Sequence, residues 1–497
     1  MGTHLLTSLQ EYLHGISTFG IIGVVLMLYP VYVTCAFLNN LIKLRKFKGP
    51  MALPFLGNCY NSEALSVLRY LGKLRKRYGR VFTFFTFTKP YVVVCEPVAV
   101  RRILSDPKTF IKGEDYSTVF NIAFGEGLVT SNGDKHKRDR GLFHKYFIKT
   151  NIAPFLVHAN TIAIEAIEEE IVKGQKVGIS YNIEEFFAIL ALRTFMKFFC
   201  GKKFTKSQEE YFTKFASKGS YIVGKMIMLS QPNWSPILIP WVNEIKQGKK
   251  RFWSAMKDVI VERKSHIKAG EEPIDDCLSV LMNPENKMTE DDMSDHIITM
   301  LCAGHDTTAY FSSYTAYLLA QHPETQEKLR AEIQDILKDR TEITEKDIST
   351  MTYLNKVMQE SLRLYSIIPC VSRQSVDDIV IKEADNLSIP KGVNILIPMF
   401  LINRDPELWI NPSIFDPERF DGKTDWTSAK HGFFPFGYGT RVCIGNSLAQ
   451  LESGIFLCHL LLKFKIEQVP DFKPNIFSGI SLTTNNGISV ILTPLQS

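Results

Sequence analysis

A single cysteine lies among glycines near the C-terminal end of the chain, in segment 436–445. The segment directly precedes a long apolar stretch, 447–464, which is predicted to form a helix. A cysteine at the start of a helix meets unpaired backbone N–H groups and the positive end of the helix dipole, and both favour a thiolate. Because the thiolate is the form that binds metals, Cys443 is a candidate metal ligand.

The residues around Cys443 have separable expected roles. Gly437 and Gly439 permit backbone angles that a Cβ would forbid, and Gly445 is expected to leave room for a flat cofactor close to the chain. Phe436 is expected to cover the sulfur and limit its access to water. The alternative for a lone cysteine is a buried structural residue ahead of a core helix.

Segment 436–445 resembles the haem-binding loop of the cytochrome P450 superfamily. The resemblance implies that Cys443 is the axial thiolate of the haem iron and that Arg441 contacts a haem propionate. The implied cofactor is haem b, iron protoporphyrin. Thiolate ligation pushes electron density onto the iron and favours O–O cleavage, so the implied chemistry is oxygen activation.

A second motif lies within a predicted long helix. The helix is expected to begin at Thr289, with Asp292 as its capping partner, and to continue to His322, which precedes Pro323. At about 1.5 Å per residue it would extend roughly 50 Å and must cross the core of a domain. In its middle, segment 303–308 is polar where packing residues are expected.

This polar segment would be costly in a helix built for stability alone. Glycine in a helix interior costs about 1 kcal/mol relative to alanine, and a buried aspartate costs more unless it is paired or wetted. A solvated turn on an exposed face is the alternative, but apolar neighbours at 297–301 and Phe311 favour burial.

Segment 303–308 resembles the oxygen-activation motif of the same superfamily. The resemblance implies that Asp306 and Thr307 deliver protons and that Ala303 and Gly304 leave space above the haem, with His305 or Thr308 in a supporting role. Ala303 stands where many fatty-acid ω-hydroxylases carry a haem-linking Glu, which implies that the haem is not covalently attached.

Three further charged residues match a structural motif of the superfamily. Glu360 and Arg363 lie three residues apart, ordinarily a surface pair worth roughly 0.2–0.5 kcal/mol. In the superfamily this pair is buried and joined by an Arg from a later segment, here Arg419. The resemblance therefore implies that the three residues hold the fold on the haem-binding side.

The resemblance also assigns propionate contacts to Arg373 and Arg140. His136 replaces the Trp that the superfamily usually has four residues before Arg140, so its cofactor-binding role is expected to depend on pH. Ser366 and Asn403 stand where Pro and His are common, and the sequence gives them no functional meaning.

Composition bounds the remaining possibilities. The 497 residues contain no repeat or Gly/Ser linker, and 34 Phe residues supply bulky apolar side chains for a core that encloses a lipophilic ligand. The net charge of +6 is spread along the chain, so nucleic-acid binding has no support. The nine cysteines include no Cys-x-x-Cys pair, and their odd number argues against a disulfide framework and for a reducing compartment.

The N-terminal region predicts a membrane anchor. Residues 16–38 carry no charge, which is long enough to cross a bilayer of roughly 30 Å, and a basic cluster follows at 43–48. We therefore expect a luminal segment 1–15, a transmembrane signal anchor 16–38, a basic Pro/Gly hinge 39–58 and a cytosolic catalytic domain 59–497, on the endoplasmic reticulum. The alternative is a cleaved signal peptide.

The body of the chain is expected to be mainly α with a small β region, and the resemblance implies the cytochrome P450 fold. Runs 81–87 and 91–95 predict a hairpin that turns at Lys89 and Pro90. Helical patterns cover about 150–280, 290–338 and 346–365. Short strand signals return at 379–381, 394–397 and 489–492.

The resemblance implies a microsomal monooxygenase that inserts one atom of O2 into a lipophilic substrate, such as a sterol or fatty acid. Two apolar regions, 116–127 and 221–242, are candidates for the pocket, with core packing as the alternative. The electrons would come from NADPH through a separate cytochrome P450 reductase, or partly from cytochrome b5. The rival interpretations are a haem-thiolate isomerase or dehydratase that acts on a lipid peroxide without external electrons, and a non-catalytic haem sensor.

Overall fold

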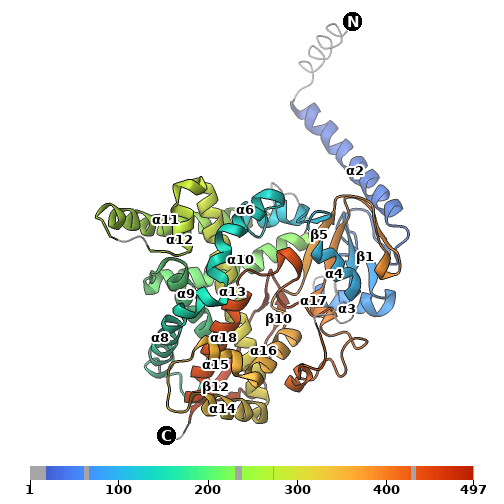
Figure 1. The fold of residues 1–497 in the computed structure, drawn as a ribbon. Helices are drawn as coiled ribbons and strands as arrows, with labels where there is room; N and C mark the ends of the chain where they lie inside the picture. The colour runs from blue at the N-terminus through green and yellow to red at the C-terminus, as the bar shows by residue number, and fades with distance from the viewer. Residues whose placement is uncertain (1–17, 61–66, 230–237, 272–273, 427–431, 496–497) are drawn as a thin grey trace. The chain divides into compact units, whose positions relative to one another are not determined.

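The computed structural model describes residues 18–60, 67–229, 238–271, 274–426 and 432–495. The chain divides into two compact units, Met1–Val93 and Val94–Ser497. Figure 1 shows that most of the described structure is helical, with short strands between the helices. This confirms the predicted class, mainly α with a small β region.

The described part of the first unit contains α2 (Thr18–Lys43), α3 (Val67–Tyr78) and a hairpin of β1 (Val81–Thr86) and β2, which begins at Lys89 and ends at Val94. The hairpin was predicted, but its predicted turn at Lys89 and Pro90 is wrong. Both residues belong to β2. The chain reverses before them at Phe87, whose φ of +50° lies in the left-handed region. Proline is tolerated here because it lies at the start of the strand.

The Pro/Gly segment that precedes α3 is fastened to β1. Thr83 N–H donates to the Lys48 carbonyl at 2.8 Å, and Phe85 N–H donates to Asn58 Oδ1 at 2.7 Å. Gly57 has a φ of +56°, and a Cβ there would lie 2.1 Å from the Phe87 carbonyl oxygen. Glycine is therefore required where the segment meets the hairpin.

The predicted anchor 16–38 falls within α2 except for its first two residues, which lie outside the described residues, as does the predicted luminal segment 1–15. Across the described part of the chain, no helix has both the length and the apolar character needed to cross a membrane.

Helices of the second unit surround α13, the long helix that the sequence predicts. The main helices are α4 (Pro97–Ser105), α5 (Asn121–Phe124), α6 (Gly133–His144), α7 (Lys149–Ile152), α8 (Leu156–Ala166), α9 (Ile183–Cys200), α10 (Lys206–Leu229), α11 (Ile239–Lys268), α12 (Cys277–Met282), α13 (Glu290–Gln321), α14 (Pro323–Leu337), α15 (Glu345–Thr350), α16 (Thr352–Leu364), α17 (Met399–Ile402) and α18 (Asn446–Lys463). A π-helical turn, η2 (Tyr116–Phe120), precedes α5, and two 3-10 turns matter for the site: η8 (Pro417–Phe420) and η9 (Gly439–Arg441).

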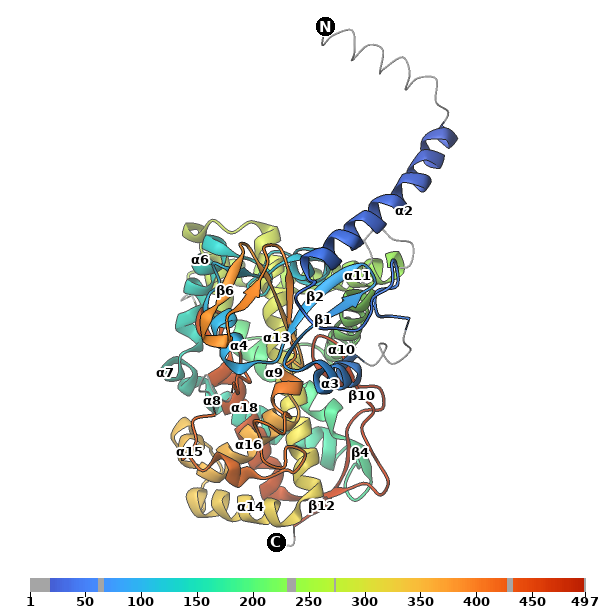
Figure 2. The same ribbon diagram turned by 90° about the vertical axis from the view of Figure 1, so that its right-hand side faces the viewer.

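Helix α13 begins and ends where the sequence predicts. Thr289 accepts a hydrogen bond from the Asp292 N–H, and the Asp292 side chain accepts one from the Thr289 N–H, which completes a capping box. The helix ends before Pro323, which has no N–H and begins α14. Helices α9, α16 and α18 pack against α13, as Figures 1 and 2 show, so most of its side chains are buried.

Short antiparallel strands complete the second unit. The sheets are β3 (Phe110–Ile111), β5 (Val371–Ser375) and β8 (Asn394–Ile397); β4 (Ser180–Asn182), β12 (Ser489–Pro494) and β9 (Phe464–Gln468); β6 (Ile379–Ile381) with β7 (Leu387–Ile389); and β10 (Ile476–Ser478) with β11 (Leu482–Thr484). In the last hairpin Ser478 pairs with Leu482, so residues 479–481 form its tip. This tip lies near α13 and carries one of its polar partners.

Candidate active site

The loop before α18 holds Cys443 by its backbone. The Cys443 N–H donates to the Phe436 carbonyl at 2.8 Å, which closes the loop on itself. Gly437 and Gly439 have φ angles of +80° and +70°, so both occupy the left-handed region as the sequence predicts. Although the loop lies within the protein, Cys443 keeps an accessible surface.

The electrostatic setting of Cys443 differs from the expectation in one respect. Burial raises the pKa of the thiol, while the Gly445 N–H and the Arg140 guanidinium lower it. The expected stabilising groups are therefore present, but burial outweighs them, so the loop alone does not hold a thiolate. A metal cation bonded to the sulfur would supply the missing positive charge.

The protein atoms around Gly445 leave space for a side chain, as expected if a flat cofactor lies close to the chain here. A Cβ there would lie 3.9 Å from the Phe147 ring and 4.0 Å from Cys443 Sγ, which are ordinary contacts. What Gly445 contributes in the structure is its N–H group, directed at the sulfur.

Four cations from different elements face one another near this loop: Lys112 after β3, Arg140 on α6, Arg373 on β5 and Arg441 in η9. Burial lowers the pKa of Arg441 to about 10, and repulsion from Arg373 adds to the shift. Burial, Arg373 and Arg441 lower the pKa of Lys112 well below its ordinary value. Within the described residues, no carboxylate raises the pKa of any of the four.

The hydrogen bonds of this cluster leave one arginine incomplete. Arg441 Nη2 donates to the Ser131 carbonyl at 2.8 Å and to Asn132 Oδ1 at 3.2 Å. Its Nη1 is buried and has no hydrogen-bond partner among the described residues. Arg373 Nη1 donates to the Ser372 carbonyl at 2.8 Å. A buried donor without a partner costs free energy, so this position favours an anionic ligand.

His136 lies buried on α6 beside the same cations. Burial, followed by Arg441, Arg140 and Lys112, lowers its pKa to about 4. The pH dependence predicted from the sequence therefore falls in an acidic range, and the imidazole is neutral at neutral pH.

The middle of α13 combines buried and accessible residues. Ala303 is exposed, and Gly304 and Thr307 are half-buried, although 297–301 and 308–320 are buried. An accessible face in the middle of a core helix marks free volume beside it. Thr307 Oγ1 donates to the Ala303 carbonyl at 2.5 Å, so its hydroxyl lies on this face.

The two proton-carrying residues of α13 have separate partners. Asp306 is buried, and its Oδ2 accepts a hydrogen bond from Ser481 Oγ at 2.5 Å. Burial raises the pKa of Asp306 to about 6. Asp306 and Thr307 are neighbours in the sequence, but their side chains bind different partners.

Two neighbours on α13 contribute to packing against α9. A Cβ on Gly304 would lie 2.3 Å from the Phe195 ring, so the space that this glycine leaves is taken by Phe195 and not by a cofactor. The His305 ring hydrogen-bonds the Ala188 carbonyl, and burial lowers its pKa to about 4. The imidazole of His305 is therefore neutral at neutral pH, and its supporting role in proton delivery stays a prediction.

The two apolar regions expected to shape a pocket meet in one buried cluster. Val119 of η2 packs with Val223 and Met226 of α10 and with Val242 of α11. This packing corresponds to the core alternative for both regions. Trp234, Pro236 and Ile237, which belong to the second region, lie outside the described residues.

Comparison with known proteins places these features in a family. A family model described as Cytochrome P450 matches residues 47–491. The chain is 29% identical to human Cytochrome P450 4F8 over 499 residues, covering 93% of each chain. It is 26% identical to Beta-amyrin 11-oxidase of Glycyrrhiza uralensis, covering 86% of this chain and 88% of the relative. It is also 25% identical to Cytokinin hydroxylase of Arabidopsis thaliana, covering 92% and 89%.

This chain belongs to the cytochrome P450 family. It is accordingly a monooxygenase, and the family binds haem b through a cysteine thiolate. The predicted family, enzyme class and cofactor are thus confirmed.

The residues present fit a haem. Cys443 is accessible and enclosed, as an axial ligand must be, and the cation cluster lacks the negative charge that two propionates carry. The unpartnered Nη1 of Arg441 is a free donor for one of them. No group of three or more His, Cys, Asp or Glu side chains in the described residues could hold a metal ion instead.

The expected structural group of Glu360, Arg363 and Arg419 is present and buried. Arg363 forms two hydrogen bonds of 2.7 Å with Glu360, and Arg419 Nε lies 3.5 Å from Glu360 Oε1. Arg363 Nη1 also donates to the carbonyls of Asn403 and Pro412, at 2.9 and 2.8 Å. Every charge in this group has a partner.

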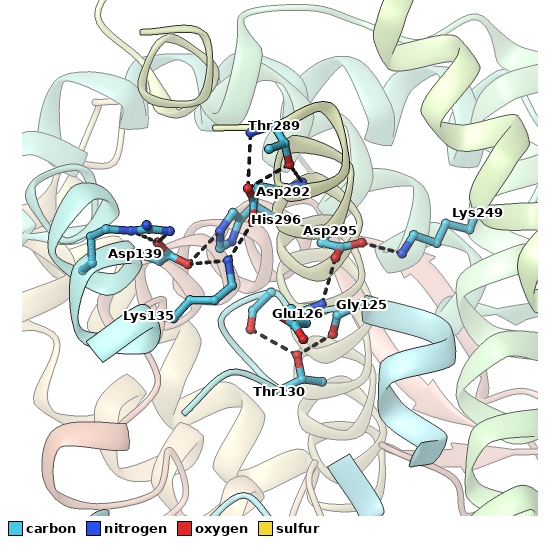
Figure 3. A network of polar contacts seen from close by, with 12 residues as sticks. Gly125, Glu126, Thr130, Lys135, Asp139, Lys249, Thr289, Asp292, Asp295 and His296 are labelled. Carbon is cyan, nitrogen blue, oxygen red and sulfur yellow. Dashed lines mark hydrogen bonds and ion pairs between the residues drawn. The ribbon is translucent and has the colours of Figure 1, made fainter. Parts of the chain in front are cut away.

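Polar side chains hold α6 against the start of α13 (Figure 3), among them Asp139 and His296, which the sequence did not single out. Asp139 is fully buried, and its Oδ2 lies 3.1 Å from His296 Nε2. Lys135 Nζ lies 2.7 Å from Asp292 and 3.4 Å from Asp139. Because Lys135 and Asp139 face α13, His136 and Arg140 of the same helix are turned toward the cation cluster.

The loop that precedes α6 is fixed to α13 in the same region (Figure 3). Asp295 accepts hydrogen bonds from the Glu126 N–H at 2.8 Å and from Lys249 Nζ at 2.5 Å. A Cβ on Gly125 would lie 2.0 Å from the Asp295 carboxylate, so only glycine fits there. This loop continues to Ser131, whose carbonyl accepts from Arg441, so α13 also fixes the surroundings of that arginine.

Lys112 is the main residue of the cation cluster that sequence reasoning missed. No motif marks it, because a lysine after a short strand is ordinarily a surface residue. Its proximity to Asn132 is visible only in the fold, where its N–H and carbonyl both pair with the Asn132 side chain, at 3.0 and 2.8 Å.

Proposed function

We propose that this P450 oxygenates a lipophilic substrate, such as a fatty acid or sterol, with electrons from NADPH through a separate reductase. P450 enzymes use redox partners and lipophilic substrates as a family. The observation that carries the proposal is the pairing of an accessible cysteine with a buried cation cluster for which the described residues provide no carboxylate.

Residue roles follow from that pairing. Cys443 would be the axial thiolate, and Arg140, Arg373, Arg441 and Lys112 would bind the propionates, with neutral His136 as a hydrogen-bond partner. When bound, the haem supplies the activation of dioxygen for insertion of one oxygen atom into a C–H bond.

Residues of α13 would leave volume for the substrate and transfer protons. The exposed Ala303 leaves volume for substrate beside the helix, and Thr307 presents its hydroxyl on the same face. Asp306, with a pKa of about 6, both holds and releases a proton near neutral pH. Bound to Ser481, it is oriented as the proton source on this side of the helix.

A spectrum tests the ligand assignment. We expect the reduced carbon monoxide adduct of the wild-type enzyme to have a thiolate-type band, and Cys443→Ser to lose it. The control Cys59→Ser, a half-buried cysteine of the first unit, should keep the band. A band unchanged in Cys443→Ser, or an imidazole-type band in the wild type, would contradict the assignment.

Isotope labelling tests the reaction. With labelled O2, NADPH and reductase, one oxygen atom of the product should carry the label. Turnover of a lipid peroxide without reductase would favour the isomerase or dehydratase instead. The names of two relatives, an oxidase and a hydroxylase, describe oxygenation in those proteins and favour the monooxygenase here.

A separate reductase would dock on basic residues such as Lys135, Lys137, Arg138 and Lys328, but three of these form ion pairs within the chain. Lys135 pairs with Asp292 and Asp139, and Lys328 pairs with Glu418. A reductase that docks on this surface would have to compete with these pairs, so Lys137, which is exposed, is the better residue for charge-reversal experiments.

We also propose that residues 16–38 anchor the enzyme to the endoplasmic reticulum membrane, with the catalytic domain cytosolic. Supporting observations are the absence of charge in 16–38, the basic cluster that follows, and the exposed apolar side chains of Met27, Leu28 and Val31 on α2. Alkaline extraction of membranes should release a chain lacking 1–38 and retain the full chain. Release of both would contradict the anchor.

A further inference from the structure

A second carboxyl lies close to Asp306, and a short chain of hydroxyl groups extends from each of the two. Glu184 is the second residue of α9, and its side chain is half-buried, so it is in contact with both solvent and the core. Thr484 Oγ1 donates to Glu184 Oε2 at 2.8 Å, and the Tyr310 hydroxyl hydrogen-bonds the same carboxylate. Tyr310 lies one turn after Asp306 on α13.

The hydroxyl groups form two short chains. On the Asp306 side, Ser481 Oγ donates to Asp306 Oδ2 at 2.5 Å and lies 2.9 Å from Ser220 Oγ. On the Glu184 side, the Tyr310 hydroxyl lies 3.5 Å from Ser217 Oγ. Both chains begin on α13 and end on α10.

The donors and acceptors of the first chain can be assigned. Ser481 has one hydroxyl proton, which it gives to Asp306, so Ser220 must donate to Ser481 Oγ. The Ser481 N–H in turn donates to Ser220 Oγ at 3.2 Å. The chain thus has a defined direction, with its donors pointing toward Asp306.

The two chains end side by side. Ser217 and Ser220 are three residues apart on α10, a spacing that puts side chains on the same helix face. The hairpin tip is pressed against this face, because a Cβ on Gly479 would lie 2.9 Å from the Ser220 carbonyl oxygen. One water molecule between the two serines would complete a continuous path.

We infer that Glu184 supplies protons to Asp306 through Tyr310, Ser217, Ser220 and Ser481. In this step the Glu184 carboxylic acid loses a proton, the Asp306 carboxylate gains one, and Glu184 recovers its proton from solvent. This inference rests on the proposed role of Asp306 as the proton source of the reaction.

The electrostatics of the two carboxyls suit this transfer. Burial raises the pKa of Glu184 to about 7, with a contribution from Asp306, and burial raises that of Asp306 to about 6. The groups that face the pair are Tyr310, Tyr314 and Cys302 on α13 and the exposed Glu185 on α9. A cation, Arg404, acts on Tyr314. Both carboxyls therefore exchange protons in the same neutral range.

The test compares Glu184→Gln with Glu185→Gln, an exposed carboxylate next to it in sequence, in the haem-loaded full chain. We expect Asp306→Asn to lower product formation by about 100-fold, as loss of a positioned proton donor does. Glu184→Gln should lose less product formation than Asp306→Asn. Compared with the wild type, it should show a larger solvent deuterium isotope effect and use a smaller fraction of the NADPH electrons for product formation. Glu185→Gln should match the wild type.

Infrared titration provides a readout independent of turnover. With carboxyl carbons labelled in Asp, the protonated Asp306 band of the wild type should titrate near pH 6. With the label in Glu instead, the Glu184 band should titrate near pH 7 in the wild type and at lower pH in Asp306→Asn, because a neighbouring negative charge is lost. Ser481→Ala should shift the frequency of the Asp306 band, because the hydroxyl donor is lost.

The outcomes separate the two proposals. If Asp306→Asn behaves as the wild type, the proposed role of Asp306 fails. If Asp306→Asn is impaired but leaves the Glu184 titration unchanged, while Glu184→Gln and Ser481→Ala match Glu185→Gln in isotope effect, only the path from Glu184 is overturned. The thiolate-type carbon monoxide band verifies that each variant is folded and loaded.

Discussion

Two buried groups of arginines in this P450 differ in how their charge is balanced. The Glu360 group joins two arginines to a carboxylate and to several carbonyl oxygens, so each charge and donor finds a partner within the chain. The cluster around Arg441 brings four cations together, and in the described part of the chain no carboxylate raises their pKa values and one guanidinium nitrogen has no hydrogen-bond partner.

This difference distinguishes a structural group from a binding group. Burying a charge is unfavourable unless it is paired, so a balanced group is stable by itself. An unbalanced group raises the free energy of the empty protein and repays that cost when an anion binds. We therefore expect substitutions in the two groups to have opposite effects on the haem-free protein.

The largest effect is expected for Glu360→Gln. Removing the carboxylate leaves Arg363 and Arg419 buried without their anion, which should lower the free energy of unfolding by about 3–5 kcal/mol. Thermal unfolding of the holoenzyme measures the loss. The control is Glu418→Gln in the adjacent η8, where an exposed carboxylate pairs with Lys328 and Lys356 and should cost at most about 1 kcal/mol. Equal losses would contradict the structural role of Glu360.

The next largest effect is expected for Lys112→Met. The haem-free protein should unfold at an unchanged or higher temperature, because a buried cation next to two others is removed. Haem affinity should fall about 10-fold, equivalent to about 1.4 kcal/mol, because a propionate loses a partner. Haem transfer to a scavenger protein measures the affinity. Lys108→Met, an exposed lysine nearby, should change neither quantity. A destabilised haem-free protein with unchanged affinity would show that Lys112 is structural.

The sequence predicts the balanced group better than the unbalanced one. Glu360 and Arg363 are close in sequence on one helix, and a family motif supplies Arg419. Arg140, Arg373 and Arg441 also come from motifs. Lys112 does not, because its place in the cluster depends on how β3, β5 and η9 pack, and no local pattern encodes that packing.

The oxygen-side motif shows the same limit. The sequence predicts the helix, its capping box and the unusual residues in its middle. It does not predict which side chain each residue meets: Phe195 for Gly304, Ala188 for His305 and Ser481 for Asp306. Those partners lie on α9 and on a hairpin far along the chain, so spacing within the motif carries no information about them.

A smaller effect is expected from His136, which lies next to the unbalanced cluster. Its pKa falls from an ordinary 6.5 to about 4, so the folded haem-free protein takes up a proton less readily than the unfolded chain. The stability linked to His136 is therefore complete above pH 6.5 and is lost as the pH falls toward 4. The haem-free wild type should therefore lose melting temperature between about pH 7 and about pH 5, as the pH enters this window. His136→Phe should reduce that loss.

Bound haem should weaken the pH dependence that is linked to His136. Propionates would attract the protonated imidazole and offset the repulsion by the cations, so the difference between His136→Phe and the wild type should shrink in the holoenzyme. His144→Phe, at an exposed position at the end of the same helix α6, is the matched control in both forms. Identical pH dependence of His136→Phe and the wild type without haem would contradict this account.

The smallest effect concerns two residues that depart from the family pattern. Ser366 and Asn403 stand where Pro and His are common, and in the structure Asn403 Nδ2 donates to Ser366 Oγ at 2.9 Å. Both are buried, and the Asn403 carbonyl also accepts from Arg363, so the pair borders the balanced group. The two departures therefore compensate each other.

A double-mutant cycle of Ser366→Ala and Asn403→Ala tests this compensation. Ser366→Ala alone should lower the free energy of unfolding by about 1–3 kcal/mol, because it leaves the Asn403 amide buried without its acceptor. The double variant should lose less than the sum of the single variants, with a coupling of about 1 kcal/mol from the shared hydrogen bond. Urea unfolding of the holoenzyme measures all four proteins. Strict additivity of the two losses would mean that the two residues do not stabilise each other. The balanced group would then consist only of its charged side chains and the carbonyl groups that they bind.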